Sequence, residues 1–395
     1  MTTAGGDGDA GDRRGTGDDR GAGDAWDDGG SGDDGGSGDD GDARDGRGAE
    51  GGWGRWDDAV AVVDLDERGW PLRDTRAGPR PVPPPGLLDH FAARLTPPSW
   101  ATDVVVYVHG WQTSRTSSRQ AVRELLSLAG RQLARRPELY PGLGGARGSG
   151  PGGARGRGFA PWPVLIRWPS RSLPSLGGYR RIRDRAHAMS TAGHAADVIG
   201  QLLGYLDARR GDPQAAPVLA GRGGQYLHLV GHSFGCRFLC EAVQWTAGAP
   251  GGTLGWSTPA PPGRPFTVDS MLLFQMAAPR DAFAETFTEL AGAPLRGPVV
   301  ATYAQGDRAT GFWHLRAEKR TGIGHAGIGT APAPVSGIRM RGTGDGYPHA
   351  ALDHRFVSVD ASHVFVRGRG PAGAHSDHLR PESAHLLLSL ADHSR

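Results

Sequence analysis

The sequence has only two cysteines, one lysine and no long apolar run, and each shortage narrows what the chain can be. Cys236 and Cys240 lie four residues apart in a segment with helical periodicity, where their side chains diverge too far for an easy disulfide. Neither a metal-ligand spacing nor a framework of paired cysteines is present. We therefore expect two packed free thiols, a reducing compartment and no metal site.

The lack of a long apolar run also argues against a membrane-spanning segment. No apolar stretch approaches the ~18 residues that a membrane span needs, and the residues after Met1 lack the basic and apolar regions of a signal peptide. We expect a soluble, cytoplasmic protein. Nearly all its positive charge is arginine, as a GC-rich coding sequence would give, and the net charge is only +2, so no nucleic-acid partner is predicted.

Composition divides the chain. Residues 1–52 are dominated by Gly and Asp and cannot bury enough apolar surface to offset the entropy of ordering, so we expect a disordered acidic tail. The Asp runs lack the bidentate Glu and apolar helices of a calcium loop. Residues 53–395 are expected to form one α/β domain, with a disordered Gly/Arg-rich insertion at 141–160.

Apolar runs with the length of strands alternate with helical patterns along this domain. The predicted strands are 103–108, 163–168, 226–230, 271–276, 299–303 and 356–359, and the longer helices are 117–135, 178–209 and 381–390. An antiparallel hairpin over 59–72 is expected at a sheet edge. Alternation of strands and helices favours a doubly wound, mostly parallel sheet flanked by helices, with ligands at the carboxyl ends of the strands.

Ser233 is the predicted nucleophile. It stands in Gly231-His232-Ser233-Phe234-Gly235, and in a chain with 65 glycines this pattern alone carries little weight. Its context is more specific, because an apolar strand precedes the serine and a helix follows it, as in a nucleophile elbow. The simpler alternative, a serine that caps the helix, does not require glycine on both sides.

Acyl transfer also needs donors for the oxyanion, and two backbone N–H groups are the usual solution. The N–H of Phe234 follows the nucleophile directly. His109-Gly110-Trp111 follows an earlier strand, which makes the N–H of Trp111 the second candidate. His109 itself is expected to fix this loop rather than to act as a base.

A histidine and an acid complete the predicted site, in the chain order serine, acid, histidine. Asp307 follows the strand at 299–303 and is the expected acid, with Asp281 as the rival. His375 lies in a loop of small residues before the last helix and is the expected base. His363 and His378 are the alternatives.

Three motifs together resemble a known family. Val108 to Trp111, Trp168-Pro169-Ser170 followed by Tyr179 and Asp184, and Val230 to Gly235 are similar to the α/β-hydrolase superfamily of lipases and esterases. The likeness is strongest to an uncharacterised group of α/β-hydrolases described as a domain of unknown function. This resemblance implies a Ser-Asp-His triad without a cofactor, and it implies no particular substrate.

The expected function is hydrolysis of a carboxylic ester, with a small-molecule acyl compound as the partner. Trp111, Trp168, Phe312 and Trp313 are the aromatic residues expected near an apolar pocket. The segment 310–348 is either a lid or a long irregular loop. Acyltransferase or thioesterase activity and a catalytically silent binding scaffold are the alternatives, and the oligomeric state is left open.

Overall fold

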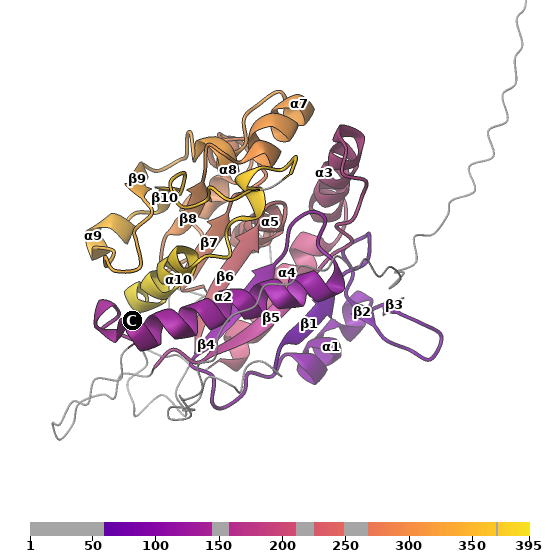
Figure 1. Ribbon diagram of the computed structural model, residues 1–395. Helices are drawn as coiled ribbons and strands as arrows, with labels where there is room; N and C mark the ends of the chain where they lie inside the picture. The colour runs from indigo at the N-terminus through magenta and orange to yellow at the C-terminus, as the bar shows by residue number, and fades with distance from the viewer. Residues whose placement is uncertain (1–58, 144–157, 211–224, 249–267, 369) are drawn as a thin grey trace, which may run out of the picture. The chain divides into compact units, whose positions relative to one another are not determined.

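The computed structural model describes residues 59–143, 158–210, 225–248, 268–368 and 370–395 (Figure 1). The chain divides into two units, Met1–Ala49 and Glu50–Arg395, and all described residues belong to the second. The tail predicted at 1–52 and residues 144–157 of the predicted insertion lie outside the described residues.

An eight-stranded parallel sheet forms the centre of the second unit, with the strand order β1-β5-β4-β6-β7-β8-β10-β9. Its strands are β1 (Ala61–Asp64), β4 (Asp103–Val108), β5 (Pro161–Arg167), β6 (Tyr226–His232), β7 (Ser270–Phe274), β8 (Val299–Tyr303), β9 (Val335–Arg339) and β10 (Phe356–Asp360). Every pair of neighbours is parallel. The β-branched run of β4 is wholly buried, as a strand covered on both faces must be.

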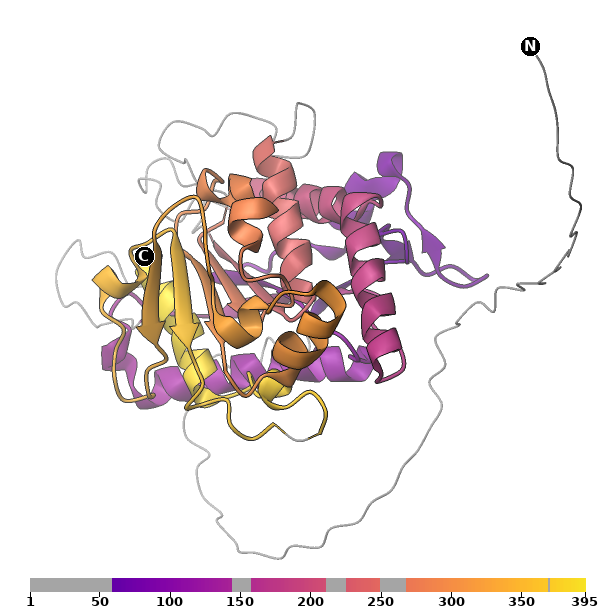
Figure 2. The same cartoon turned by 90° about the horizontal axis from the view of Figure 1, so that it is seen from above.

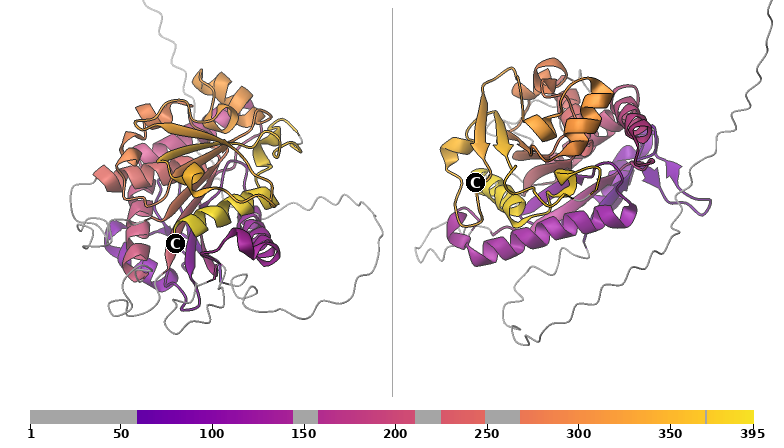
Figure 3. Two further views of the ribbon diagram at one scale, coloured as in Figure 1. Left: turned by 90° about the vertical axis from the view of Figure 1, so that its left-hand side faces the viewer. Right: turned by 45° about the horizontal axis from the view of Figure 1, so that its top comes forward.

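Helices cover both faces of this sheet. The longer ones are α1 (Leu87–Arg94), α2 (Arg115–Arg135), α3 (Leu176–Thr191), α4 (Ala195–Arg209), α5 (Gly235–Gly248) and α10 (Pro381–His393). Figure 2 shows α2 and α10 on one side and α3, α4 and α5 on the other, and the right-hand view of Figure 3 shows α2 running along the sheet. Two separate apolar cores result, one on each face. The predicted α/β class with a mostly parallel sheet is confirmed.

The chain changes direction across the sheet at β4. From β4 it passes to β5 on one side, and it later returns to β6 on the other side of β4. Loops that leave two such neighbouring strands at their carboxyl ends diverge to opposite faces and open a crevice where ligands bind in parallel α/β sheets. The turns after β4 and β6 are those that carry Trp111 and Ser233.

The amino-terminal hairpin differs from the prediction. β1 lies at the sheet edge as expected, but it pairs in parallel with β5. Only one antiparallel bridge, Leu65 to Pro71, joins the arms of the expected hairpin, because proline has no N–H with which to continue the ladder. β2 (Leu72–Arg73) instead pairs with β3 (Arg80–Pro81) in a second small sheet.

Two further segments also differ. The helix expected over 178–209 is divided into α3 and α4 at Gly193, where a Cβ would lie 2.6 Å from the carbonyl oxygen of Arg68. The segment 310–348 is not one irregular loop, since it contains most of a π-helix (Ala309–Trp313) and all of α7 (His314–Glu318), α8 (Ile323–Ala326) and the edge strand β9. The remaining short α-helices are α6 (Ala282–Glu285) and α9 (His349–Leu352), and 3-10 helices are formed by Pro84–Gly86, Pro137–Leu139, Thr288–Ala291 and Ala374–Ser376.

A buried carboxylate anchors the start of β4. Asp103 is fully buried, and it accepts hydrogen bonds from His228 Nε2 (2.9 Å) and from Arg395 Nη2 (2.9 Å). Burial alone would raise the pKa of Asp103, but the charge of Arg395 and the bonds from His228 and Thr102 outweigh it and lower the pKa. The central strand is thus tied to β6 and to Arg395, two residues past the end of α10.

Replacement of Asp103 by Ala is expected to lower the free energy of unfolding by about 3–5 kcal/mol, because it leaves the buried Arg395 guanidinium without its carboxylate. Urea unfolding followed by circular dichroism measures this change. Asp74→Ala is the matched control, since Asp74 is exposed, and it should change stability by less than about 0.5 kcal/mol. Equal stability of the two variants would contradict a structural role for this network.

Candidate active site

Ser233 occupies a strained turn between β6 and α5. Its φ of 56° lies in the left-handed region, which a serine adopts at a cost. Backbone hydrogen bonds hold it there, from Ser233 N to Phe274 O (3.0 Å) and from Ala277 N to Ser233 O (3.2 Å). The segment around the end of β7 therefore fixes the backbone that presents the Ser233 hydroxyl.

The turns after β4 and β6 touch each other, and glycine makes this approach feasible. A Cβ on Gly235 would lie 2.2 Å from the carbonyl oxygen of Val108, and a Cβ on Gly110 would lie 2.6 Å from the Cβ of Ser233. Neither distance is tolerable for a side chain. Gly235 therefore leaves room for the end of β4 at Val108.

Ser233, His375 and Asp307 form a continuous hydrogen-bonded chain. Ser233 Oγ lies 2.7 Å from His375 Nε2, and His375 Nδ1 lies 2.8 Å from Asp307 Oδ2. Because a carboxylate only accepts, we assign the proton to Nδ1, which leaves Nε2 to accept from the serine hydroxyl. All three side chains are buried, with exposed fractions of 1% for Ser233, 6% for His375 and 0% for Asp307.

A glutamine that the sequence analysis missed joins the acid to the loop of the histidine. Gln275 follows β7 directly, has a φ of 47° and is fully buried. Its Nε2 donates to Asp307 Oδ2 (3.2 Å) and to the carbonyl oxygen of Ala374 (2.9 Å). The other carboxylate oxygen of Asp307 accepts from Thr310 N (3.0 Å). A polar residue directly after a buried strand was the available signal.

Two buried histidines support the same loop. His232 Nε2 donates to the carbonyl oxygen of His375 (2.9 Å), and its ring stacks on His378 with centroids 3.9 Å apart. His378 Nε2 lies 3.3 Å from the hydroxyl of Tyr107. Burial lowers the pKa of His232 well below its ordinary value and that of His378 to about 3. Both rings are therefore neutral and support the loop that carries His375 by hydrogen bonding and stacking.

The alternative acid, Asp281, and the alternative bases, His363 and His378, make no hydrogen bond to Ser233 or His375. Asp281 Oδ1 accepts from the hydroxyl of Thr330 (3.0 Å), so Asp307 and not Asp281 is the carboxylate bonded to His375. His363 accepts from Arg339 Nε (3.3 Å). His378, although close, stacks on His232 and makes no bond to the serine.

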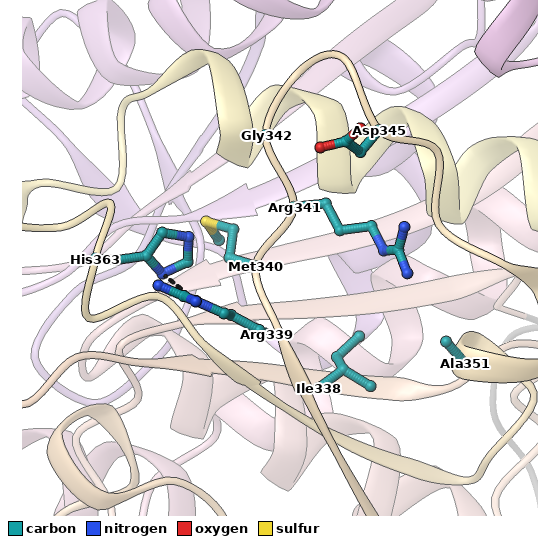
Figure 4. A pocket seen from close by; sticks show the side chains of 8 residues that line it. All are labelled: Ile338, Arg339, Met340, Arg341, Gly342, Asp345, Ala351 and His363. Carbon is teal, nitrogen blue, oxygen red and sulfur yellow. Dashed lines mark hydrogen bonds between the residues drawn. The ribbon is translucent and has the colours of Figure 1, made fainter.

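His363 belongs to a groove at the β9 edge of the sheet, shown in Figure 4. This groove has a volume of about 590 Å³, and neither Ser233 nor its partners contribute to its wall. The residues that line it are Ile338, Arg339, Met340, Arg341, Gly342, Asp345, Ala351 and His363. It is a surface feature separate from the Ser233 site.

The two expected oxyanion donors are backbone N–H groups that are free to donate a hydrogen bond. Among the described residues, neither the N–H of Phe234 nor that of Trp111 has a hydrogen-bond partner. Their residues follow β6 and β4, whose turns are in contact at Gly110 and Ser233. Two free donors beside a buried serine hydroxyl are what an oxyanion site requires.

The loop that carries Trp111 is tied to the loop after β5. Trp168 Nε1 donates to the carbonyl oxygen of His109 (2.8 Å), and Trp111 Nε1 donates to the hydroxyl of Ser172 (2.7 Å). Burial lowers the pKa of His109 to about 4, and His109 Nε2 accepts from the N–H of Trp168 (3.4 Å). His109 therefore fixes this loop, as expected.

The four aromatic residues expected around an apolar pocket do not share one. Trp168 is 1% exposed and packs on Phe238 in the core, whereas Phe312 is 51% exposed. Trp313 Nε1 donates to the carbonyl oxygen of Pro371 (3.1 Å), which joins the π-helix to the loop before α10. Ser233 itself is only 1% exposed.

Cys236 and Cys240 are free and buried, which confirms two packed thiols. In the described part of the chain, no group of three or more His, Cys, Asp and Glu side chains is arranged to hold a metal ion. Nor does any described helix combine the length and the apolar character that crossing a bilayer demands.

No protein-family model, curated protein or solved structure matches this chain. What the fold and the site define is a class: an α/β protein with a buried Ser–His–Asp hydrogen-bond chain at the carboxyl ends of its parallel strands.

The tautomer of His375 gives a direct test of this geometry. Nitrogen NMR of the wild type should show the proton of neutral His375 on Nδ1, and Asp307→Ala should remove that preference because the acceptor is lost. Asp281→Ala, which removes the rival carboxylate, should leave the spectrum of His375 unchanged. The opposite pattern would assign the acid to Asp281.

Stability should fall in mild acid because buried histidines resist protonation. The pKa of folded His378, about 3, lies below the ~6.5 of an unfolded chain, so between these values the unfolded state binds more protons. This stabilisation is complete above pH ~6.5 and is lost as the pH falls.

Between pH 7 and pH 5, His378 alone should account for about 2 kcal/mol of lost unfolding free energy. Urea unfolding at the two pH values measures the loss, and His378→Phe should reduce it by that amount. An unchanged pH dependence in His378→Phe would show that His378 is not a buried neutral group.

Proposed function

We propose that the protein is a serine hydrolase of the α/β-hydrolase fold that cleaves a carboxylic ester through an acyl-enzyme intermediate. The observation that carries this proposal is the hydrogen-bonded chain from Ser233 Oγ to His375 Nε2 (2.7 Å) and from His375 Nδ1 to Asp307 (2.8 Å). A serine at the end of a strand, held with a left-handed backbone, is the position from which an elbow nucleophile acts.

In the proposed first step, His375 Nε2 accepts the proton of Ser233 as Oγ attacks the acyl carbonyl carbon. The negative charge of Asp307 stabilises the imidazolium that forms. The N–H groups of Phe234 and Trp111 receive the oxyanion of the tetrahedral intermediate. His375 then gives the proton to the leaving alcohol, and the acyl group remains on Ser233.

In the second step a water molecule replaces the alcohol. His375 takes a proton from this water, whose oxygen attacks the acyl carbon. As the bond between this carbon and Ser233 Oγ breaks, His375 returns the proton to Oγ and the carboxylic acid is released. No cofactor takes part in either step. Thioesters and acyl acceptors other than water would use the same groups, so the acyl group is the common element of the proposal.

Support comes from the order of the groups as well as their distances. Serine, acid and histidine follow one another along the chain at positions 233, 307 and 375, at the ends of β6 and β8 and in the loop before α10. This is the order of the α/β-hydrolases. Gln275 and His232 hold the histidine loop through two successive carbonyl groups, which favours a preorganised base.

A fluorophosphonate probe should label the wild-type protein at Ser233 and leave folded Ser233→Ala unlabelled. Hydrolysis of a short p-nitrophenyl ester should lose a factor of about 10³–10⁴ in kcat in Asp307→Asn, because the wrong tautomer of His375 becomes favoured. Labelling is read by mass spectrometry of the peptide, and hydrolysis by absorbance.

Asp281→Asn is the matched control and should keep wild-type kcat, since Asp281 bonds to Thr330 rather than to His375. Folded wild-type protein that takes up no probe and hydrolyses no ester would overturn the hydrolase proposal and leave a binding scaffold.

A further inference from the structure

Beside Ser233 lies a cluster of buried polar groups that have no partners. Within the described residues, Tyr179 OH, Arg237 Nε, Thr310 Oγ1 and both ring nitrogens of His314 make no hydrogen bond. Their side chains belong to residues that are at most 8% exposed. Buried polar groups are satisfied in most proteins because an unmade hydrogen bond opposes folding, so a concentration of them calls for a ligand.

These groups come from α3, from α5 and from the π-helix that continues into α7. Figure 1 labels α3, α5 and α7. The rings of Tyr179 and His314 are 6.5 Å apart. Thr310 and His314 both border Gly322, whose Cβ would lie 2.9 Å and 2.7 Å from them. Arg237 is one helical turn beyond Ser233 on α5.

The cluster adjoins the proposed oxyanion donors. The ring of Tyr179 packs on Phe234 with centroids 5.3 Å apart and meets Trp111 edge-on at 5.4 Å. Phe234 and Trp111 are the residues whose N–H groups have no hydrogen-bond partner among the described residues. A group bound by Tyr179 and Arg237 would therefore belong to the same molecule as the acyl carbon that Ser233 attacks.

The cluster carries the positive charge of Arg237, and no carboxylate of the described residues forms a salt bridge with it. Arg237 forms no salt bridge with any described residue, and its recorded side-chain partner is His187 Nδ1, 3.4 Å from Nη2. Glu241, one turn further along α5, is buried; burial raises its pKa, and the charge of Arg237 lowers it in part. The neighbouring Arg183 differs, because it is paired with Asp184 and Glu318.

The other members of the cluster are neutral donors. Burial, together with the charge of Arg237, lowers the pKa of His314 to about 3, so the ring carries one N–H. Burial raises the pKa of Tyr179, so its hydroxyl keeps its proton. A guanidinium with hydroxyl and imidazole donors around it matches the oxygens of a carboxylate or a phosphate.

We propose that Arg237, Tyr179 and His314 form a subsite for an anionic oxygen group of the substrate. The preferred substrate is then an acyl ester that carries a carboxylate or phosphate within the same molecule. This inference rests on the proposed hydrolase function, and it assigns the recognition of that substrate to residues outside the Ser233–His375–Asp307 chain. Thr310 Oγ1 is positioned to add a fourth donor.

Two esters of similar length test the preference. The p-nitrophenyl monoester of glutaric acid carries a carboxylate, and p-nitrophenyl pentanoate does not. We expect the wild type to favour the anionic ester by at least about tenfold in kcat/KM, and Arg237→Met to lower that ratio by about tenfold or more. Arg181→Met, an exposed arginine on α3, is the matched control and should keep the wild-type ratio.

Direct binding separates this inference from the hydrolase proposal. Calorimetry with Ser233→Ala protein measures binding of monomethyl glutarate, butyl phosphate and the neutral dimethyl glutarate at fixed ionic strength, without catalysis. We expect one of the two anions to bind at least tenfold more tightly than dimethyl glutarate, and Arg237→Met in the same background to remove this difference. The tighter of the two anions identifies carboxylate or phosphate as the recognised group.

Equal binding of the anions and dimethyl glutarate, or an unchanged preference in folded Arg237→Met, would overturn the subsite. If Ser233 is still labelled by fluorophosphonate in that case, the hydrolase proposal stands and only the anion subsite fails. If anion binding depends on Arg237 but the wild-type protein takes up no probe, the anion subsite stands and the hydrolase proposal fails.

Discussion

The contact between the turn after β4 and the turn after β6 is the constraint on which the site depends. Gly110 and Gly235 allow these turns to approach within van der Waals distance, and the left-handed backbone at Ser233 directs its hydroxyl to the same place. A side chain at either glycine would separate the turns. The turns that carry Trp111 and Ser233 would then no longer meet, so the proposed chemistry depends on backbone packing.

Much of this arrangement is readable from the sequence. Strands buried on both faces give β-branched runs such as β4, and the order of Ser233, Asp307 and His375 along the chain is the one that the resemblance to α/β-hydrolases implies. Asp307 was favoured over Asp281 because it stands just past the carboxyl end of a predicted strand. These features depend on local sequence and on a single topological rule, which is why they could be predicted.

Other features could not be read from local patterns. β9 has only intermediate and exposed positions, because an edge strand needs no continuous apolar run. The break between α3 and α4 depends on the approach of Arg68 to Gly193, which are far apart in the sequence. Gln275 acquires its role only when β7 and β8 lie side by side. Helical periodicity and strand composition carry no information about such tertiary contacts.

Gln275 couples two loops of the site that come from different strands. Its amide bonds to Asp307 and to the carbonyl of Ala374, so the loops after β8 and β10 are coupled through a residue that belongs to neither. A chimera that exchanged one of these loops alone would break the coupling even if Asp307 and His375 were both retained. The segments that follow β7, β8 and β10 therefore form one structural unit around the Ser233–His375–Asp307 chain.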